Sequence, residues 1–167
     1  MILGKSYVSL RAIEKDDLLQ LMQWRNKPEF RKYFRENSEI NIEKQYKWFD
    51  MINGANSSHK MFAILDLKTN KLIGACGLCY IDWINRSADF SIYIGHNDIY
   101  IDNKFAVEAA ELMVYYGFSV LNLHRLWAEI YSIDEAKKSF FNTLNFKLDG
   151  ELRETCLLYT SPSPRDS

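Results

Sequence analysis

Trp24, Arg25 and Asn26 are three adjacent residues whose side chains have the functional groups to hold a ligand. A guanidinium can bind a carboxylate or phosphate through paired hydrogen bonds, and an indole can stack on the face of a sugar or a base. The same run can be ordinary structure, with Trp24 in the core and the two polar residues at a helix end. The sequence alone leaves both interpretations open.

The cysteines and histidines do not form the pattern of a metal or nucleophile site. Cys76 and Cys79 are spaced like half of a zinc site, but no second Cys or His pair follows at ligand spacing. On a strand, side chains three residues apart point to opposite faces. His59, His96 and His124 are widely separated and no Gly-x-Ser-x-Gly motif accompanies them. We therefore expect free thiols, structural histidines and no metal.

Length, composition and charge indicate one folded domain. The chain has 167 residues, of which 47% are hydrophobic and 14% aromatic, and its formal net charge is −1. A chain of this length can bury a continuous core without disulfides or metal. Acids and bases are interspersed, so we expect neither nucleic acid nor a membrane as partner. With no signal pattern and no apolar segment of about 20 residues, the sequence predicts a cytoplasmic protein.

The first half of the chain is predicted to contain one strand, two helices and three more strands. Alternation predicts a strand over 7–13, and the helix after it should break near Pro28. A second helix is expected to open at Asn41 as its N-cap. The period then changes to that of consecutive antiparallel strands, expected over 60–67, 71–81 and 88–95.

The second half of the chain predicts α-β-α-β. Helical spacing covers 103–117, and alternation covers 124–132. Ser132 and Glu135 fit a capping box for a last helix, and a further strand begins at Lys147. The full order is β-α-α-β-β-β-α-β-α-β, which predicts the α/β class, with a mixed sheet (α+β) and helices on both faces.

The end of the chain differs in composition from the rest. Residues 156–167 read CLLYTSPSPRDS and are rich in Ser and Pro. We interpret them as a non-native or disordered tail, and we expect the domain to comprise residues 1–155. The C-terminal strand of the fold would then be missing, leaving an unpaired sheet edge.

Three stretches carry a resemblance to a known family: LRAIEKDDLLQLMQWRN, LIGACGL followed by ADFSIYIG, and FAVEA leading to HRLWAEIYSIDEAKKSFFNTLNF. In this order and spacing they resemble the GNAT N-acetyltransferases, in the branch of ribosomal-protein, spermidine and nucleotide-amino-sugar acetyltransferases. The resemblance covers roughly residues 7–154. It implies the GNAT-like acyl-CoA N-acyltransferase fold and an enzyme that transfers acetyl from acetyl-CoA to a primary amine. A small-molecule acceptor and a monomer or homodimer are expected.

The resemblance implies where acetyl-CoA binds. A loop entering a helix can hold the pyrophosphate through unpaired N–H groups. The matching segment consists of Ile101, Asp102, Asn103, Lys104, Phe105 and Ala106. The family has Gln or Arg, two residues, Gly, one residue, then Gly or Ala, and only Ala106 fits this pattern. Lys104 could add a favourable charge, whereas Asp102 is an acid near the anion. The alternative interpretation is a plain strand-to-helix connection.

Other cofactor contacts are implied by the same resemblance. Pantetheine would pair with exposed backbone around Ile92, Tyr93 and Ile94, where this strand splays from the strand predicted over 124–132. Asp134 stands where relatives have an Asn that contacts the cofactor arm, and Lys137 follows it in the same helix turn. For Asp134 the alternative is an acid in a first helical turn, which the helix dipole favours.

The resemblance also assigns candidate catalytic residues. Asp89 matches a strand acid that faces the acceptor, so it is the predicted base that takes the proton of the amine, and Glu14 is the second candidate. An exposed or salt-bridged strand acid is the alternative for Asp89. Phe141 stands where relatives have a Tyr that protonates the leaving thiolate. Solvent or another hydroxyl, such as that of Ser139, would replace it.

The acceptor is predicted from the first helix. Trp24, Arg25 and Asn26 resemble the run found in surface-polysaccharide and nucleotide-amino-sugar acetyltransferases, and Tyr80 and Trp83 would flank the same opening. The resemblance therefore favours a nucleotide-linked amino sugar. The alternatives are a protein N-terminus, spermidine or an aminoglycoside as acceptor, or a catalytically inactive module that binds a ligand.

Overall fold

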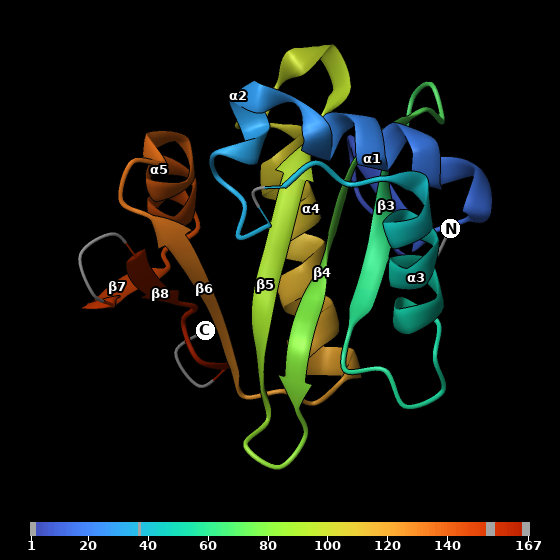
Figure 1. The fold of residues 1–167 in the computed structure, drawn as a ribbon. Coiled ribbons are helices and arrows are strands. Elements are labelled where there is room, and N and C mark those ends of the chain that lie inside the picture. Colours follow the sequence, from blue (N-terminus) through green and yellow to red (C-terminus); the bar gives the residue numbers. More distant parts are fainter. Residues whose placement is uncertain (1–2, 37, 153–155, 165–167) are drawn as a thin grey trace.

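The computed structural model describes residues 3–36, 38–152 and 156–164 (Figure 1). Its strands are β1 (Leu3–Gly4), β2 (Val8–Ala12), β3 (Lys60–Asp66), β4 (Leu72–Asp82), β5 (Ser87–Ile94), β6 (Arg125–Tyr131), β7 (Lys147–Leu152) and β8 (Cys156–Thr160). Its α-helices are α1 (Leu18–Asn26), α2 (Pro28–Arg31), α3 (Ile42–Ile52), α4 (Phe105–Tyr115) and α5 (Glu135–Thr143). A π-helical turn, Tyr116–Val120, continues α4.

The strands form one mixed sheet in the order β1-β2-β3-β4-β5-β6-β8-β7. All neighbours are antiparallel except β5 and β6, which run parallel because α4 carries the chain between them. The predicted order β-α-α-β-β-β-α-β-α-β is therefore confirmed. The structure adds to it the short helix α2 after α1 and two strands, β1 at one edge and β8 near the other.

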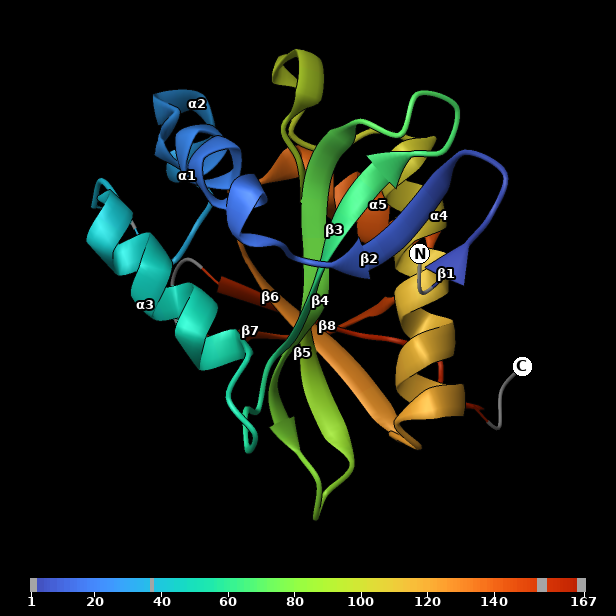
Figure 2. The same ribbon diagram turned by 90° about the vertical axis from the view of Figure 1, so that its right-hand side faces the viewer.

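Helices cover both faces of the sheet, as predicted. Figure 2 shows α1, α2 and α3 on one side of the central strands and α4 on the other. The two faces of β5 explain this arrangement, because alternate residues of the strand enter different cores. Phe90 and Ile92 pack with residues of α4 and α5, whereas Tyr93 packs with residues of α1 and α2.

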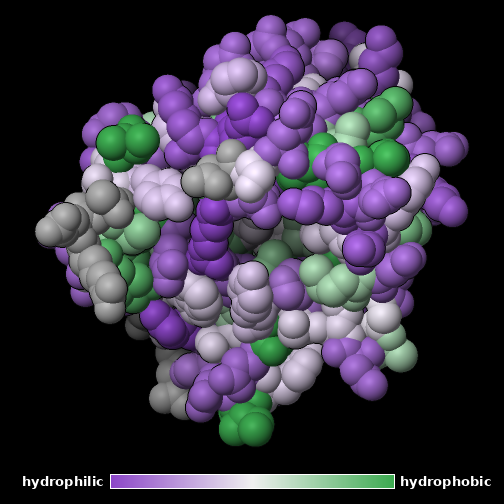
Figure 3. Space-filling view, viewed as in Figure 1, coloured by the Kyte–Doolittle hydropathy of each residue, from purple (hydrophilic) through white to green (hydrophobic). Residues whose placement is uncertain are grey.

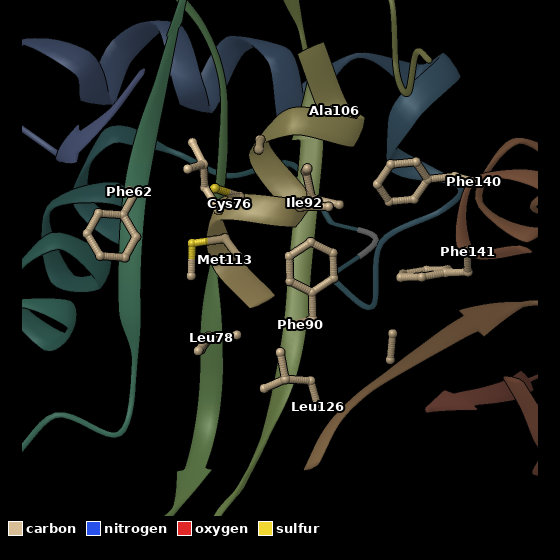
Figure 4. Packing of buried hydrophobic residues seen from close by; sticks show 14 of the residues in the cluster. Phe62, Cys76, Leu78, Phe90, Ile92, Ala106, Met113, Leu126, Phe140 and Phe141 are labelled. Carbon is tan, nitrogen blue, oxygen red and sulfur yellow. The ribbon is translucent and has the colours of Figure 1, made fainter. Parts of the chain in front are cut away.

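The larger core lies between the sheet and the helices α4 and α5. Figure 4 shows Phe90 and Ile92 of β5 close to Ala106 and Met113 of α4 and to Phe141 of α5. The rings of Phe90 and Phe141 meet edge to face, with centroids 6.1 Å apart. Burial of such aromatic and aliphatic side chains is the main favourable contribution to folding. This core fixes β5 and α5, which carry parts of the site described below.

The helix ends follow the sequence in two cases and differ in one. Asn41 caps α3 through a bond from the N–H of Lys44, and α1 ends at Asn26, before Pro28. The predicted capping box of Ser132 and Glu135 is wrong. Asp134 is the N-cap of α5 instead, because its Oδ1 accepts a hydrogen bond from the backbone N–H of the third residue of the helix, 3.1 Å away.

The structure also corrects the expectation of a missing last strand. Residues 156–160, assigned from composition to a tail, form β8 and pair with both β6 and β7. Leu157 and Tyr159 alternate into the core, and the ring of Tyr159 stacks on that of Phe141 with centroids 5.6 Å apart. The Ser and Pro residues that dominated the composition follow this short alternating run. A domain ending at residue 155 would exclude this strand.

Candidate active site

The parallel strands β5 and β6 separate partway along their length. Their ladder pairs Ser87–Asp89 with Arg125–Trp127 and ends there, although both strands continue. Beyond this point β6 pairs along its other edge with β8. The splay implied by the family resemblance is therefore present, and Asp89 lies in the last residue pair before the strands diverge.

Backbone groups of β5 face this opening. The N–H of Gly95, directly after β5, donates to the carbonyl of Ile73 in β4. The N–H of Ile94 points to the opposite side of the strand and donates to the carbonyl of Tyr100. Because backbone directions alternate along a strand, the N–H and C=O of Ile92 point into the space between β5 and β6. They are positioned to pair with the amides of an extended ligand. The side chains of Ile92 and Ile94 are buried in the core and do not face the opening.

The point where β5 and β6 diverge, after Asp89 and Trp127, is called the fork below. A cavity of about 300 Å³ lies beside the fork, on the face covered by α1, α2 and α3. Figure 3 shows a hollow near the middle of the same face, rimmed mostly by hydrophilic side chains. The volume suits a small ligand. The charged residues that line the cavity are three acids and three bases, namely Glu36, Asp89, Glu129, Arg25, Arg35 and Lys137.

Asp89 forms the centre of a charged cluster at the fork. Its Oδ2 lies 3.0 Å from an Nη2 of Arg35, and the same nitrogen lies 3.3 Å from Oε2 of Glu129 on β6. The Arg35 side chain is half exposed and belongs to the connection between α2 and α3, whereas Asp89 is only 8% exposed. A half-exposed cation from a helix connection therefore bridges two acids that belong to neighbouring strands.

Burial raises the pKa of Asp89 to about 6. Loss of hydration is the largest cause, because it disfavours the charged carboxylate, and the cations Arg35 and Lys137 lower the pKa in opposition. Glu129 adds a smaller upward contribution. A carboxylate with a pKa near 6 is ionised at neutral pH and is a stronger proton acceptor than an ordinary aspartate.

The structure separates the roles of Trp24, Arg25 and Asn26. Trp24 is buried, and Gly95 lies so close to its indole that a Cβ there would be 2.1 Å from the ring. Asn26 forms two hydrogen bonds with the backbone of Ile40, of 2.7 and 2.8 Å. Trp24 and Asn26 therefore have structural roles.

Arg25 is the member of this run that faces the cavity. Its guanidinium lies over the ring of Phe34, 4.8 Å from the centroid. Its buried Nε has no hydrogen-bond partner among the residues that the structure describes.

Tyr80 and Trp83, the other predicted acceptor contacts, differ in position. Tyr80 lines the cavity beneath Arg35, with the guanidinium 5.9 Å from the ring centroid. Its backbone has a φ of 50° where the β4–β5 register shifts, an uncommon conformation for a residue with a side chain. Trp83 is half exposed in the turn after β4 and does not line the cavity.

Asp134 and Lys137 form a buried polar group with Tyr100. Asp134 is 1% exposed, and its Oδ2 accepts a hydrogen bond of 2.9 Å from the Tyr100 hydroxyl. With the cap bond to Lys137, both of its oxygens have partners. The ammonium of Lys137 lies 5.2 Å from the Tyr100 ring centroid and lines the cavity. Burial lowers the pKa of Lys137 to about 8, against the opposing effect of Asp134 and Asp89.

The segment from Ile101 to Ala106 does lead into a helix N-terminus, that of α4. The carboxylate of Asp102 accepts hydrogen bonds from the backbone N–H groups of Lys104, Phe105 and Ala106, at 3.2, 2.9 and 2.7 Å. These are the groups expected to hold a pyrophosphate. In this conformation the loop does not fit that anion, because an internal carboxylate already occupies its donors.

Glu14 lies away from the cavity. It is exposed at the start of a short 3₁₀ turn, Lys15–Asp17, and its N–H donates to Asp17 at 2.8 Å. Asp17 also receives two hydrogen bonds from Arg11. Glu14 therefore belongs to a local capping arrangement, and nothing in its position supports the role of base.

Several cavity residues have no clear signal in the sequence. Arg35 is one of several charged residues in its segment, and Glu129 is a single acid within a mostly apolar strand. His59, expected to be structural, lines the cavity beside Tyr80 with ring centroids 4.8 Å apart. Burial lowers the pKa of His59. Cys79 also lines the cavity, and burial raises the pKa of its thiol to about 12, so a reactive thiolate is disfavoured at neutral pH.

Among the described residues no cluster of three or more His, Cys, Asp or Glu side chains has metal-binding geometry. Within the same residues no helix combines the length and the apolar character needed to cross a membrane.

The chain is similar to several known N-acetyltransferases. A family model described as an acetyltransferase (GNAT) domain matches residues 8–147. An uncharacterized N-acetyltransferase, p20 of Bacillus licheniformis, is 30% identical over 149 residues, which cover 88% of this chain and 83% of that protein. The spermidine N(1)-acetyltransferase of Escherichia coli K12 is 30% identical over 146 residues, covering 87% and 75%.

Solved structures share the fold. Spermidine N-acetyltransferase from Vibrio cholerae, in complex with CoA and spermine, superposes with a TM-score of 0.83 at 22% identity, over 95% of this chain and 96% of that one. Another structure of the Vibrio protein, with a TM-score of 0.75 at 22% identity over 92% of each chain, is a dodecamer in an intermediate state. At this identity the likeness establishes the fold alone, and the predicted monomer or homodimer stays a prediction.

Proposed function

The chain belongs to the GNAT acetyltransferase domain family, whose activity depends on acetyl-CoA, and from that premise we propose that it acetylates a primary amine of a polyamine, with Asp89 as the general base. The observation that carries this proposal is the position of Asp89. It lies at the fork of β5 and β6, it lines the cavity, and its pKa is raised to about 6.

Two observations support a polyamine as acceptor. The relatives from Escherichia coli and Vibrio cholerae are named spermidine N-acetyltransferases. In this chain, Asp89 and Glu129 already hold one cation between them, the guanidinium of Arg35. A protonated amine can take the same place, because an ammonium group makes charge-assisted hydrogen bonds with paired carboxylates. Arg35 is half exposed and can move aside for it.

The amino-sugar hypothesis loses most of its basis. It rested on Trp24, Arg25 and Asn26, but Trp24 packs in the core and Asn26 binds the backbone of Ile40. Arg25 is the one member left to contact a ligand. The coarser assignment, N-acetyl transfer to an amine, is unaffected by this change.

The donor is expected to lie between β5 and β6. Its thioester supplies the acetyl group, and the N–H and C=O of Ile92 are placed to pair with an extended chain in the opening. Asp89, beside the opening, takes the proton that the amine must lose to become a nucleophile, either directly or through a water. Attack of the amine nitrogen on the thioester carbonyl forms the amide bond and breaks the carbon–sulfur bond.

The thiolate that leaves must gain a proton from elsewhere. Phe141 is buried in the core and has no hydroxyl. Ser139 is exposed on α5 and is not among the described residues that line the cavity. We assign this proton to solvent.

Substitution of Asp89 tests the proposal. Asp89→Asn removes the base but keeps the size of the side chain, so kcat/KM for spermidine and acetyl-CoA should fall by about 10²–10⁴. In the parent, kcat/KM should rise with pH through about 6, because Asp89 must be ionised to accept a proton, and this step should vanish in the variant. Steady-state rates between pH 5 and 9 provide the measurement.

Asp82→Asn is the matched control, since Asp82 is an acid at the end of β4 that does not line the cavity. An Asp89→Asn enzyme with unchanged kcat/KM near neutrality would remove Asp89 as base. A parent enzyme that acetylates nucleotide amino sugars but not spermidine would overturn the polyamine acceptor and leave the base intact.

A further inference from the structure

The N-terminus of α4 is closed by a side chain of its own loop. Asp102 uses both carboxylate oxygens, Oδ1 toward the N–H of Ala106 and Oδ2 toward those of Lys104 and Phe105. The first turn of a helix has four N–H groups without a partner inside the helix, and three of them are taken here. The favourable end of the helix dipole therefore already faces a negative charge.

The positive side chain of this loop does not offset that charge. The ammonium of Lys104 lies over the rings of Tyr7 and Phe105, 4.4 and 5.0 Å from their centroids. It therefore packs against aromatic rings and makes no described contact with the Asp102 carboxylate. A diphosphate that approached the α4 N-terminus would meet a carboxylate in the place of free N–H donors.

We propose that Asp102 is an intramolecular competitor for the pyrophosphate of CoA, so that its side chain must leave the α4 N-terminus before the donor binds fully. Asp102 thereby sets the affinity of this chain for CoA. The loop between β5 and α4 then has two states, closed on Asp102 or open to the diphosphate. This inference rests on the proposed position of the donor between β5 and β6, with its diphosphate at α4.

Substitution of Asp102 separates competition from simple capping. Asp102→Ala frees all three N–H groups, so CoA should bind about tenfold more tightly than it binds the parent. Asp102→Asn removes the charge but keeps an oxygen that can cap the helix, so a smaller gain is expected. Pantetheine, which lacks the pyrophosphate, should bind the parent and both variants equally.

NMR titration of ¹⁵N-labelled protein is suited to this comparison, because it measures weak and strong binding alike and reports on the amides of Lys104, Phe105 and Ala106. Asp82→Ala provides the matched control, since its carboxylate also accepts hydrogen bonds from the backbone of its own turn, those of Ile84 and Asn85, away from the cavity. Thermal unfolding of each variant verifies that it folds, and Asp102→Asn serves if the alanine variant does not.

Three results would overturn the inference. CoA could bind Asp102→Ala no more tightly than the parent, which would make Asp102 a cap alone. Pantetheine could gain as much as CoA, which would locate the effect outside the pyrophosphate site. Absence of CoA binding in the parent and in every variant would refute the proposed function together with this inference, whereas the first two results leave that function standing.

Discussion

At the scale of single residues, the site is defined by one buried acid and the cations around it. Asp89 is ionised at neutral pH although burial opposes its charge, because Arg35 and Lys137 lie close enough to stabilise it. For Lys137 the two effects on the pKa have the opposite directions: burial lowers its pKa, and Asp134 and Asp89 raise it. The charges of the cavity therefore depend on one another.

Arg35→Ala should shift the pH dependence of the reaction. Arg35 lowers the pKa of Asp89, so its removal raises that pKa, and the rise of kcat/KM should move to higher pH by about one unit. The KM for spermidine should also fall, because the variant lacks the cation that occupies Asp89 and Glu129. Arg31→Ala is the control, since Arg31 does not line the cavity. A pH profile identical to that of the parent would contradict the assigned interaction.

At the scale of elements, two strand-to-helix connections shape the site. The connection from β5 to α4 contains Tyr100 and Asp102, and the connection from β6 to α5 contains Asp134. The hydrogen bond from Tyr100 to Asp134 ties the two connections together across the gap between β5 and β6. This tie fixes α5, and with it Lys137, relative to the opening.

Asp134→Ala should destabilise the fold by about 2–4 kcal/mol, because it removes the cap of α5 and leaves the buried Tyr100 hydroxyl without its partner. Urea unfolding followed by circular dichroism would measure the change. Asp134→Asn keeps a carboxamide oxygen for the cap and should cost less. If Asp134→Ala and Asp134→Asn unfolded at the same urea concentration as the parent, the tie between the connections would have no energetic importance.

At the scale of the whole molecule, the sheet depends on its C-terminal strand. β8 lies between β6 and β7, so it pairs the edge of β6 that faces away from the fork and anchors β7 to the sheet. Tyr159 covers Phe141 of α5 from this strand. β8, which composition assigned to a tail, thus holds β6 in position beside the fork.

Tyr159→Ala should cost about 3–5 kcal/mol of unfolding free energy, the usual loss when a buried aromatic side chain is truncated. Tyr115→Ala is the matched control, because Tyr115 is half exposed at the end of α4 and its loss leaves no buried cavity. Thermal or urea unfolding compares the two. Equal stability of the two variants would indicate that β8 contributes little to the core.

The sequence by itself determined the order of the elements and the candidate base. Apolar periodicity depends on neighbouring residues, so it predicted the central strands and both long helices. The residue type of Asn41 indicated the cap of α3, and the family resemblance proposed Asp89 as the base. It failed for β8 because a five-residue run next to Ser and Pro carries little periodic signal. A strand of that kind is stabilised by two neighbouring strands far away in sequence.

Only the tertiary structure decided which residues meet. Arg35 reaches Asp89 across 54 positions of sequence and Glu129 across 94, and no local pattern records such a contact. The same holds for Trp24. The sequence made it a candidate ligand contact, but the structure packs its indole against Gly95 in the core. Asp102 is a third example. The sequence indicated an acid near the expected anion site, but only the structure shows that its carboxylate accepts the hydrogen bonds of the backbone N–H groups there.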